Sequence, residues 1–291
     1  MNKEIKISKP IFIIGTGRCG STIFYKMLSN HPDIGFISSF NVKFPKSLIL
    51  WSMNTWFGKI GLRLGIIRPS EAYSLFNSIF PGYGRPVRTL RASDVSENIE
   101  ENIRKLFVKG LKYQHKERFL YKYTGWSRIG FFNKIFPDCL FIHMIRDGRA
   151  VANSMLNVSW WNGWQGPQNW RWGDLPENYR KEWEESNKSF SVLAAIEWKM
   201  ILDEIEESKK EIEPNRFLQI KYENLIGKPI EVFTYITKYC GLSYGKKFKE
   251  RINRYKLINA NNKWKEELPK SEQIILTKCL CSHLKKYNYN L

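Results

Sequence analysis

Residues 11–22 read Ile-Phe-Ile-Ile-Gly-Thr-Gly-Arg-Cys-Gly-Ser-Thr. The four apolar residues predict a short buried strand, and the residues from Thr22 to Ser29 have the spacing of an amphipathic helix. Glycine-rich sequence joins the two. A strand, a glycine loop and a helix N-terminus present backbone N–H groups and the positive end of a helix dipole to an anion. The stretch therefore predicts an α/β protein that binds an anionic group where its first helix begins.

The glycine spacing nearly matches the phosphate-binding P-loop, G-x-x-x-x-G-K-[ST]. Gly15 and Gly20 have the required separation and Thr22 fills the last position, but Ser21 replaces the lysine that reaches the β/γ-phosphates. The cation is instead Arg18, whose planar fork suits two adjacent anionic groups held without a metal. This change disfavours a magnesium–triphosphate ligand. The alternative is a tight turn that only lets the helix pack on the strand.

Short apolar runs alternate with helical patterns along the chain, which predicts an α/β domain with a parallel sheet covered on both faces. The predicted strands are Ile11–Ile14, Ile34–Ile37, Phe119–Lys122, Leu140–Ile145 and Phe217–Ile220. The predicted helices are Thr22–Ser29, about Ser96–Leu111, Ile129–Phe136, Ala150–Leu156, Ser191–Glu211 and Pro229–Cys240.

Arg146 follows the apolar run 140–145 directly, at the strand end where ligands of open α/β sheets bind. Ser154 comes eight residues later in the next predicted helix, so both side chains can converge on one phosphate. The alternative is a local ion pair between Arg146 and Asp147. Arg149 adds a further cation near the helix start.

These elements resemble the donor-binding elements of sulfotransferases, which use 3′-phosphoadenosine-5′-phosphosulfate (PAPS). Residues 15–22, followed by Asn-His-Pro at 30–32, resemble the loop that binds the 5′-phosphosulfate. Residues 145–154 resemble the element that binds the 3′-phosphate, with Gly148 where the family usually has proline. Residues 221–225 (Lys-Tyr-Glu-Asn-Leu) are similar to the family's "RYEDL" element, and residues 261–265 (Asn-Asn-Lys-Trp-Lys) to its late "KWR" loop.

The resemblance implies one P-loop-NTPase-like domain over residues 1–291, with a central sheet of about five parallel strands and helical or loop insertions. It implies PAPS as co-substrate, adenosine 3′,5′-bisphosphate (PAP) as product, and a hydroxyl acceptor such as a carbohydrate, a lipid or a small molecule. The residues that it assigns to the donor are Gly17, Arg18, Cys19, Gly20, Ser21, Thr22, Arg146, Ser154, Tyr222, Lys263 and Trp264.

Two insertions interrupt the alternation of strands and helices. Residues of about 40–116 are expected on the acceptor side. Residues of about 157–190 are rich in tryptophan, glycine and asparagine, which is typical of a long loop. This segment is either a lid over the site or a loop that packs on the core.

The resemblance identifies Lys122 as the lysine that faces the transferred group and stabilises the leaving group; the alternative is a solvated lysine at a strand end. A base must lie within hydrogen-bond reach of the acceptor hydroxyl. Our first choice is Glu71, at a predicted helix start, and our second is Asp94. A glutamate in a first helical turn also has an ordinary role opposite the helix dipole. We expect His31 and His143 to be structural.

The chain has 47 Lys and Arg against 28 Asp and Glu, a net charge of +19. This excess favours an anionic partner. We expect the small molecule PAPS rather than nucleic acid, because no nucleic-acid-binding module is recognisable; peripheral contact with anionic surfaces stays open. An AT-rich genome, which the many Lys, Asn and Ile residues suggest, would explain the dispersed lysines equally well. The alternative functions are a P-loop kinase and a basic nucleic-acid or membrane-surface binding protein with a degenerate nucleotide fold.

No transmembrane segment or signal-peptide core is recognisable, so we expect a cytoplasmic enzyme. The five cysteines are scattered and odd in number, which is typical of reduced thiols. We expect no metal ion. The oligomeric state is not specified by any pattern.

Overall fold

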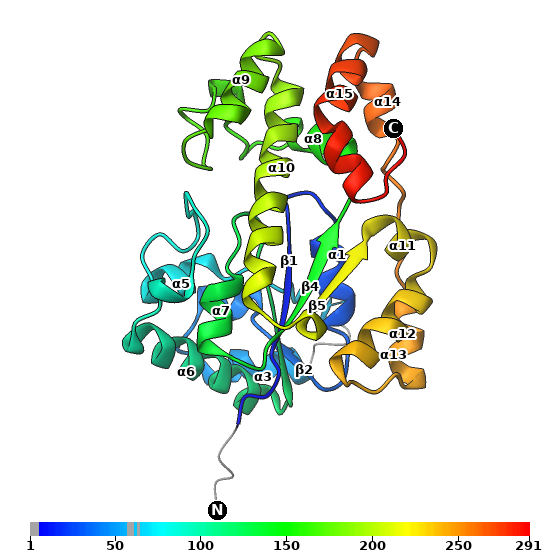
Figure 1. Ribbon diagram of the computed structural model, residues 1–291. Coiled ribbons are helices and arrows are strands. Elements are labelled where there is room, and N and C mark those ends of the chain that lie inside the picture. The colour runs from blue at the N-terminus through cyan, green and yellow to red at the C-terminus, as the bar shows by residue number, and fades with distance from the viewer. Residues whose placement is uncertain (1–5, 57–60, 63–64) are drawn as a thin grey trace, which may run out of the picture.

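The computed structural model describes residues 6–56, 61–62 and 65–291 (Figure 1). Within these residues a sheet of five strands has the order β2-β3-β1-β4-β5, and every neighbouring pair is parallel. Each strand lies within one residue of its predicted bounds, so the predicted α/β fold is confirmed. The strands are β1 (Ile11–Gly15), β2 (Ile34–Phe36), β3 (Arg118–Lys122), β4 (Leu140–Ile145) and β5 (Phe217–Lys221).

The register of the sheet brings the predicted site residues to one edge. β1 lies in the middle, with Ile11 opposite both Leu120 and Leu140. Because all strands run the same way, the glycine loop after β1 and the residues that end or follow β3, β4 and β5 meet at the carboxyl edge. Ligands of open α/β sheets bind at this edge.

The side chains of β1 alternate between two hydrophobic clusters. Phe12 and Ile14 belong to one, and Ile11 and Ile13 to the other, as expected for a strand with both faces buried. The first face is covered by α6 (Glu97–Gln114), α7 (Ile129–Ile135) and α10 (Phe190–Ser208). The second face is covered by α1 (Ser21–Leu28), α12 (Pro229–Cys240) and α13 (Lys246–Asn253).

Further helices gather beyond the carboxyl edge of the sheet (Figure 1). The helix α10 extends from the sheet face into this group and packs on α8 and α15. A short helix, α11, follows β5 directly. The bounds are α8 (Gly148–Leu156), α9 (Glu177–Glu185), α11 (Tyr222–Gly227), α14 (Lys263–Glu267) and α15 (Lys270–Lys286).

The first predicted insertion is not confined to one side of the molecule. Its α6 packs on the sheet, where Phe107 stacks on Phe119 of β3 with ring centroids 4.0 Å apart. The rest of the insertion forms α2 (Ser39–Lys43), α3 (Leu48–Trp56), α5 (Tyr73–Ile79) and the short 3-10 helix η1 (Ala92–Asp94).

The described helices contain none that is both long and apolar enough to span a bilayer.

Candidate active site

The glycine loop turns sharply into α1. Arg18 (φ 63°) and Gly20 (φ 88°) both adopt the left-handed conformation, and Gly20 caps α1. A Cβ atom on Gly20 would lie 2.3 Å from a ring carbon of Tyr222, so both the backbone and the close approach of Tyr222 require glycine here. The first turn of α1 consequently presents its N–H groups, which lack intrahelical partners, toward the carboxyl edge of the sheet.

Arg18 and Arg146 meet at this edge. Arg146 is 7% exposed, and its Nη1 atom donates to the carbonyl oxygen of Arg18 over 3.2 Å. The Nε atom of Arg18 donates to Oγ of Ser154 over 2.9 Å. The guanidinium group of Arg146 also lies 4.6 Å from the ring centre of Tyr222. The structure therefore joins both predicted anion-binding elements in one place.

Asp147 does not pair with Arg146 and instead binds Arg149. The Nη2 atom of Arg149 lies 2.8 Å from Oδ2 of Asp147, so the added cation near the start of α8 is already matched by a carboxylate. Arg149 also stacks on Trp264, 4.8 Å from its ring centre.

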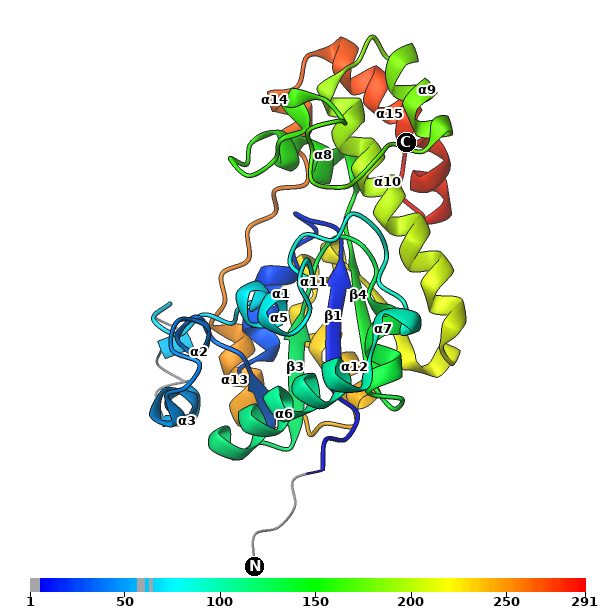
Figure 2. The ribbon, with the colours of Figure 1, turned by 90° about the vertical axis from the view of Figure 1, so that its left-hand side faces the viewer.

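The extended segment between α13 and α14 rises on the side of α1 toward the upper helices (Figure 2). It lies over Arg146, which donates to the carbonyl oxygen of Ala260 over 2.9 Å and to Oδ1 of Asn261 over 2.7 Å. The hydroxyl of Tyr222 donates to the carbonyl oxygen of Ile258 over 3.0 Å. Of the two residues expected to bind the donor from this part of the chain, Trp264 is buried and Lys263 is exposed.

A cavity of about 340 Å³ opens beside the glycine loop. Four separate parts of the chain line it: the loop with the start of α1, the residues at the start of α5, the end of β3, and the tryptophan-rich segment. The lining residues are Gly17, Arg18, Ser21, Thr22, Glu71, Tyr73, Lys122, Thr124, Trp160, Arg171 and Trp172.

Lys122 and Glu71 form an ion pair in this cavity. Lys122 is 4% exposed, which excludes a solvated strand-end lysine, and its Nζ atom also donates to Oγ1 of Thr22 over 3.1 Å. The hydroxyl of Tyr73 donates to the second carboxylate oxygen of Glu71. A buried cation and a carboxylate thus lie together next to the first turn of α1.

Glu71 reaches the cavity from the insertion because its segment pairs with the chain just after β2. Pro69 bridges Ser38 in antiparallel fashion, and the amide of Ser70 donates to the carbonyl oxygen of Ile37 over 2.8 Å. The hydroxyl of Tyr121 binds the carbonyl oxygen of Glu71 over 2.6 Å. The prediction that Glu71 begins a helix is wrong, since α5 begins at Tyr73; the backbone is held by the sheet instead.

Asp94 lies apart from the cavity lining. Its carboxylate accepts hydrogen bonds from Arg88 over 2.7 and 2.9 Å and from the amide of Arg91 over 2.8 Å. The hydrogen bonds from Arg88 lower the pKa of Asp94. The structure does not bring this carboxylate together with Lys122 or the glycine loop.

The tryptophan-rich segment contributes residues that sequence reasoning did not select. Trp172 packs on Gly125 just after β3, where a Cβ atom would lie 2.6 Å from the indole ring. Arg171 stacks on Trp172 and on Trp160, 4.6 and 5.5 Å from their ring centres. Trp161 is buried and donates to Oε2 of Glu197 on α10 over 2.9 Å. The segment therefore both packs on the core and forms one wall of the cavity.

Three titratable groups near the sheet are buried and uncharged. Burial raises the pKa of the Cys19 thiol, so this residue offers the loop its backbone amide rather than a nucleophile. Burial lowers the pKa of His143 to about 4. His31 is also buried and its Nε2 atom lies 2.7 Å from the carbonyl oxygen of Ser243, in keeping with a structural role.

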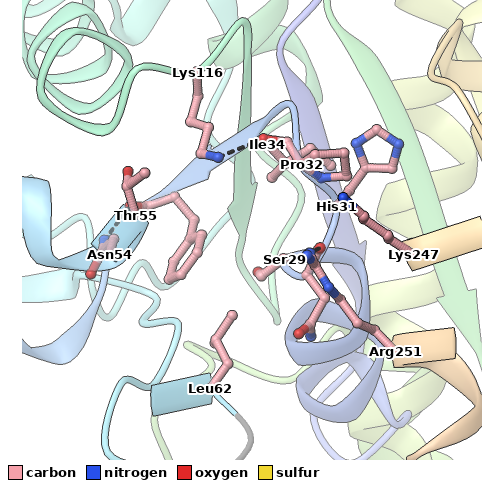
Figure 3. Close-up of a pocket in the computed structure, with 12 residues that line it drawn as sticks. Ser29, His31, Pro32, Ile34, Asn54, Thr55, Leu62, Lys116, Lys247 and Arg251 are labelled. Carbon is pink, nitrogen blue, oxygen red and sulfur yellow. Dashed lines mark hydrogen bonds between the residues drawn. The ribbon is translucent and has the colours of Figure 1, made fainter. Parts of the chain in front are cut away.

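A second cavity, of about 320 Å³, lies between the end of α1, α3 and α13 (Figure 3). Several of its polar side chains bind backbone carbonyls: Asn54 donates to Phe36 over 3.2 Å, Lys116 to Pro32 over 2.5 Å and Arg251 to Asn30 over 2.5 Å. These contacts hold the turn after α1 against its neighbours. No residue of the glycine loop lines this cavity.

In the described part of the chain, no group of three or more His, Cys, Asp or Glu side chains is arranged to hold a metal ion.

Comparison with known proteins adds three findings. A family model described as "Sulfotransferase family" matches residues 10–246. Comparison with curated protein sequences gives no match. Among solved structures, sulfotransferase STF9 from Mycobacterium avium has a TM-score of 0.60 at 15% identity, with 98% of this chain and 78% of that chain covered.

Two further structures are similar. Sulfotransferase STF1 from Mycobacterium tuberculosis H37Rv has a TM-score of 0.58 at 13% identity, over 96% of this chain and 78% of that chain. The sulfotransferase domain from the curacin biosynthetic pathway has a TM-score of 0.52 at 14% identity, over 98% of this chain and 99% of that chain. Likeness at such identities shows a shared fold.

Proposed function

Because the chain belongs to the sulfotransferase family, we propose that it transfers a sulfuryl group from PAPS to a hydroxyl group of an acceptor. The observation that best supports this proposal is the meeting of Arg18 and Arg146 at one edge of the sheet. A donor with a phosphosulfate and a separate phosphate needs two such cationic elements within reach of one nucleotide.

The residues fit this donor. Arg18 and the first-turn amides of α1, with Ser21 and Thr22, would hold the phosphosulfate. Arg146 and Ser154 would hold the 3′-phosphate. Gly17, Cys19 and Gly20 shape the loop; Tyr222, Lys263 and Trp264 belong to the elements proposed to close over the nucleotide.

The proposed chemistry is an in-line displacement at sulfur. The acceptor oxygen forms a bond to sulfur, the bond between sulfur and the bridging oxygen breaks, and the electron pair stays on the phosphate of PAP. Lys122 would stabilise the charge on that oxygen, and Glu71 would accept the acceptor's proton. The ion pair between these two side chains places both required charges in the same cavity. Asp94 remains a second candidate base, but only the sequence supports it, because its carboxylate binds Arg88 and the amide of Arg91 outside the cavity lining.

Thermal unfolding tests this function, with PAP added in EDTA and ATP added in buffer that contains Mg²⁺ and no EDTA. PAP is expected to raise the melting temperature without metal, since a ligand that binds only the folded state stabilises it by mass action. ATP with Mg²⁺ is expected to do little, because Ser21 occupies the lysine position of the P-loop. Stabilisation by ATP and Mg²⁺ alone would favour the kinase alternative. Stabilisation by RNA or anionic vesicles alone would favour the binding-protein alternative.

The cytoplasmic location stays a prediction of the sequence.

A further inference from the structure

Arg171 is one of the residues that line the cavity beside the glycine loop. It comes from the tryptophan-rich segment and lines the same cavity as Glu71 and Tyr73. Its guanidinium group lies 4.6 Å from the ring centre of Trp172 and 5.5 Å from that of Trp160. The two indole rings hold the arginine in place and add an aromatic surface beside it.

The charge of Arg171 is not matched by a contacting carboxylate among the described residues. No ion pair within 4.0 Å includes it there, and its buried Nε atom has no hydrogen-bond partner in that part of the chain. Of the other cations of the cavity, Lys122 is paired with Glu71, whereas Arg18 binds the hydroxyl of Ser154 and has no ion-pair partner within 4.0 Å among the described residues. Burying a cation without a partner costs free energy, so an arginine placed in this way favours an anionic ligand.

Glu197 interacts with the charge of Arg171 but forms no ion pair with it within 4.0 Å. Its carboxylate binds Trp161, and burial raises its pKa to about 7, so much of it is uncharged near neutral pH. Burial lowers the pKa of Arg171, and the nearby carboxylates of Glu197 and Glu71 oppose this shift only in part.

Arg171 comes from a different part of the chain than the donor elements, although it lines the same cavity. Arg18, the amides of α1 and Lys122 surround the place proposed for the phosphosulfate, and Arg146 is proposed to serve the 3′-phosphate. Arg171 belongs to the tryptophan-rich segment and lines the same cavity as the candidate base Glu71. A hydroxyl compound that reaches Glu71 would therefore pass beside this arginine and the two indole rings.

We propose that the acceptor carries an anionic group of its own, a carboxylate, sulfate or phosphate, and that Arg171 binds this group while Trp160 and Trp172 contact the adjoining ring or chain. This inference rests on the proposed function. It narrows the acceptor from any hydroxyl compound to an acidic one, such as an acidic sugar or a hydroxy acid.

Matched pairs of acid and neutral probes test it. The pairs are 4-hydroxybenzoate with its methyl ester, and methyl glucuronide with methyl glucoside. Their dissociation constants are measured by ligand-observed NMR on the PAP-saturated protein. A charge-assisted hydrogen bond is worth about 1.5–3 kcal/mol, so the acid of at least one pair is expected to bind about tenfold or more tightly than its neutral partner.

Two variants of Arg171 and one control variant test whether Arg171 causes this preference for the acid. Arg171→Gln is expected to reduce the acid preference to about twofold or less, and Arg171→Lys to keep part of it, because lysine keeps the charge but loses the planar fork. Arg180→Gln is the control: it removes an exposed arginine of α9 outside the cavity, and the acid preference should match that of the wild type.

The inference is overturned if acid and neutral probes bind equally, if neither pair binds, or if Arg171→Gln keeps the acid preference. It is also overturned if Arg171→Gln weakens PAPS binding about tenfold while the acid preference persists, because Arg171 would then belong to the donor site. A wild-type protein that does not bind PAP contradicts the proposed function instead. An Arg171-dependent acid preference in the PAP-free protein would still support the anion site in that case.

Discussion

Nε of Arg18 donates a hydrogen bond to Oγ of Ser154 over 2.9 Å, and this bond joins the glycine loop after β1 to helix α8. The two residues are 136 positions apart in the chain. Arg146, at the end of β4, closes the arrangement by donating to the carbonyl oxygen of Arg18. The loop and the β4–α8 junction are therefore connected, and if they bind the donor as proposed, a change in either is expected to affect both ends of the nucleotide.

Ser154→Ala is expected to weaken PAP binding about two- to tenfold, because it removes one hydroxyl from the proposed phosphate site and frees the side chain of Arg18. Isothermal titration calorimetry measures the effect. Ser78→Ala on the exposed face of α5 is the matched control and should bind PAP like the wild type. Unchanged affinity in Ser154→Ala would place Ser154 outside the donor site.

Gly20→Ala is expected to destabilise the protein by about 2 kcal/mol or more, since the backbone is left-handed and the added methyl group meets the ring of Tyr222. PAP affinity should fall as well, because the amides of α1 and Tyr222 are displaced together. The measurements are urea unfolding and calorimetry. Gly227→Ala, where a Cβ atom meets nothing within 4 Å, is the control and should change neither. A fully stable Gly20→Ala variant would refute the steric argument.

Glu71→Gln is expected to lower turnover by about 10²- to 10⁴-fold while PAP still binds, because general-base catalysis contributes on that scale. Label transfer from [³⁵S]PAPS to a pool of acidic acceptors measures turnover, and calorimetry measures PAP binding. Glu71→Asp keeps the carboxylate and should recover part of the rate. Full turnover in Glu71→Gln would mean that the base is another group.

Glu197→Gln is expected to change how stability depends on pH. The pKa of Glu197 in the folded protein is about 7 against an ordinary 4.5, so the folded state keeps its proton after the unfolded chain has lost it. Between these two values, rising pH therefore lowers the wild-type free energy of unfolding, by about 3 kcal/mol in total. Above about pH 7 this contribution no longer changes.

Glutamine does not ionise in this pH range. The free energy of unfolding of the variant should therefore not fall for this reason as pH rises. Urea unfolding near pH 5 and near pH 8 is expected to show the variant gaining stability relative to the wild type as pH rises. Taking the difference between the two proteins cancels the titration of other groups. A stability difference independent of pH would show that Glu197 does not titrate in this range.

The sheet and the donor elements could be predicted because their signals are local. An apolar run such as 140–145 and a glycine-rich turn specify a strand and a helix start from neighbouring residues alone. The pairing of Lys122 with Glu71 depends on a contact between β3 and a segment about fifty residues earlier, which no local pattern indicates. Glu71 was selected as a helix-start residue, although pairing with the chain after β2 is what holds it.

Arg171 was missed for the same reason: its position depends on how the tryptophan-rich segment folds back onto the end of β3. Two signals were nevertheless present. Arg171 stands between Trp170 and Trp172, and Glu197 is a single carboxylate within a run of apolar helical residues. A charge enclosed by aromatic or apolar sequence is costly to bury and therefore indicates a site that uses it.

The most direct test of the central claim compares PAP with adenosine 5′-monophosphate by calorimetry in EDTA. The two ligands differ only in the 3′-phosphate, which Arg146 and Ser154 are proposed to bind. Two or more charge-assisted hydrogen bonds predict that PAP binds at one site about a hundredfold more tightly. Equal affinities, or PAP binding that requires a divalent metal, would contradict the account.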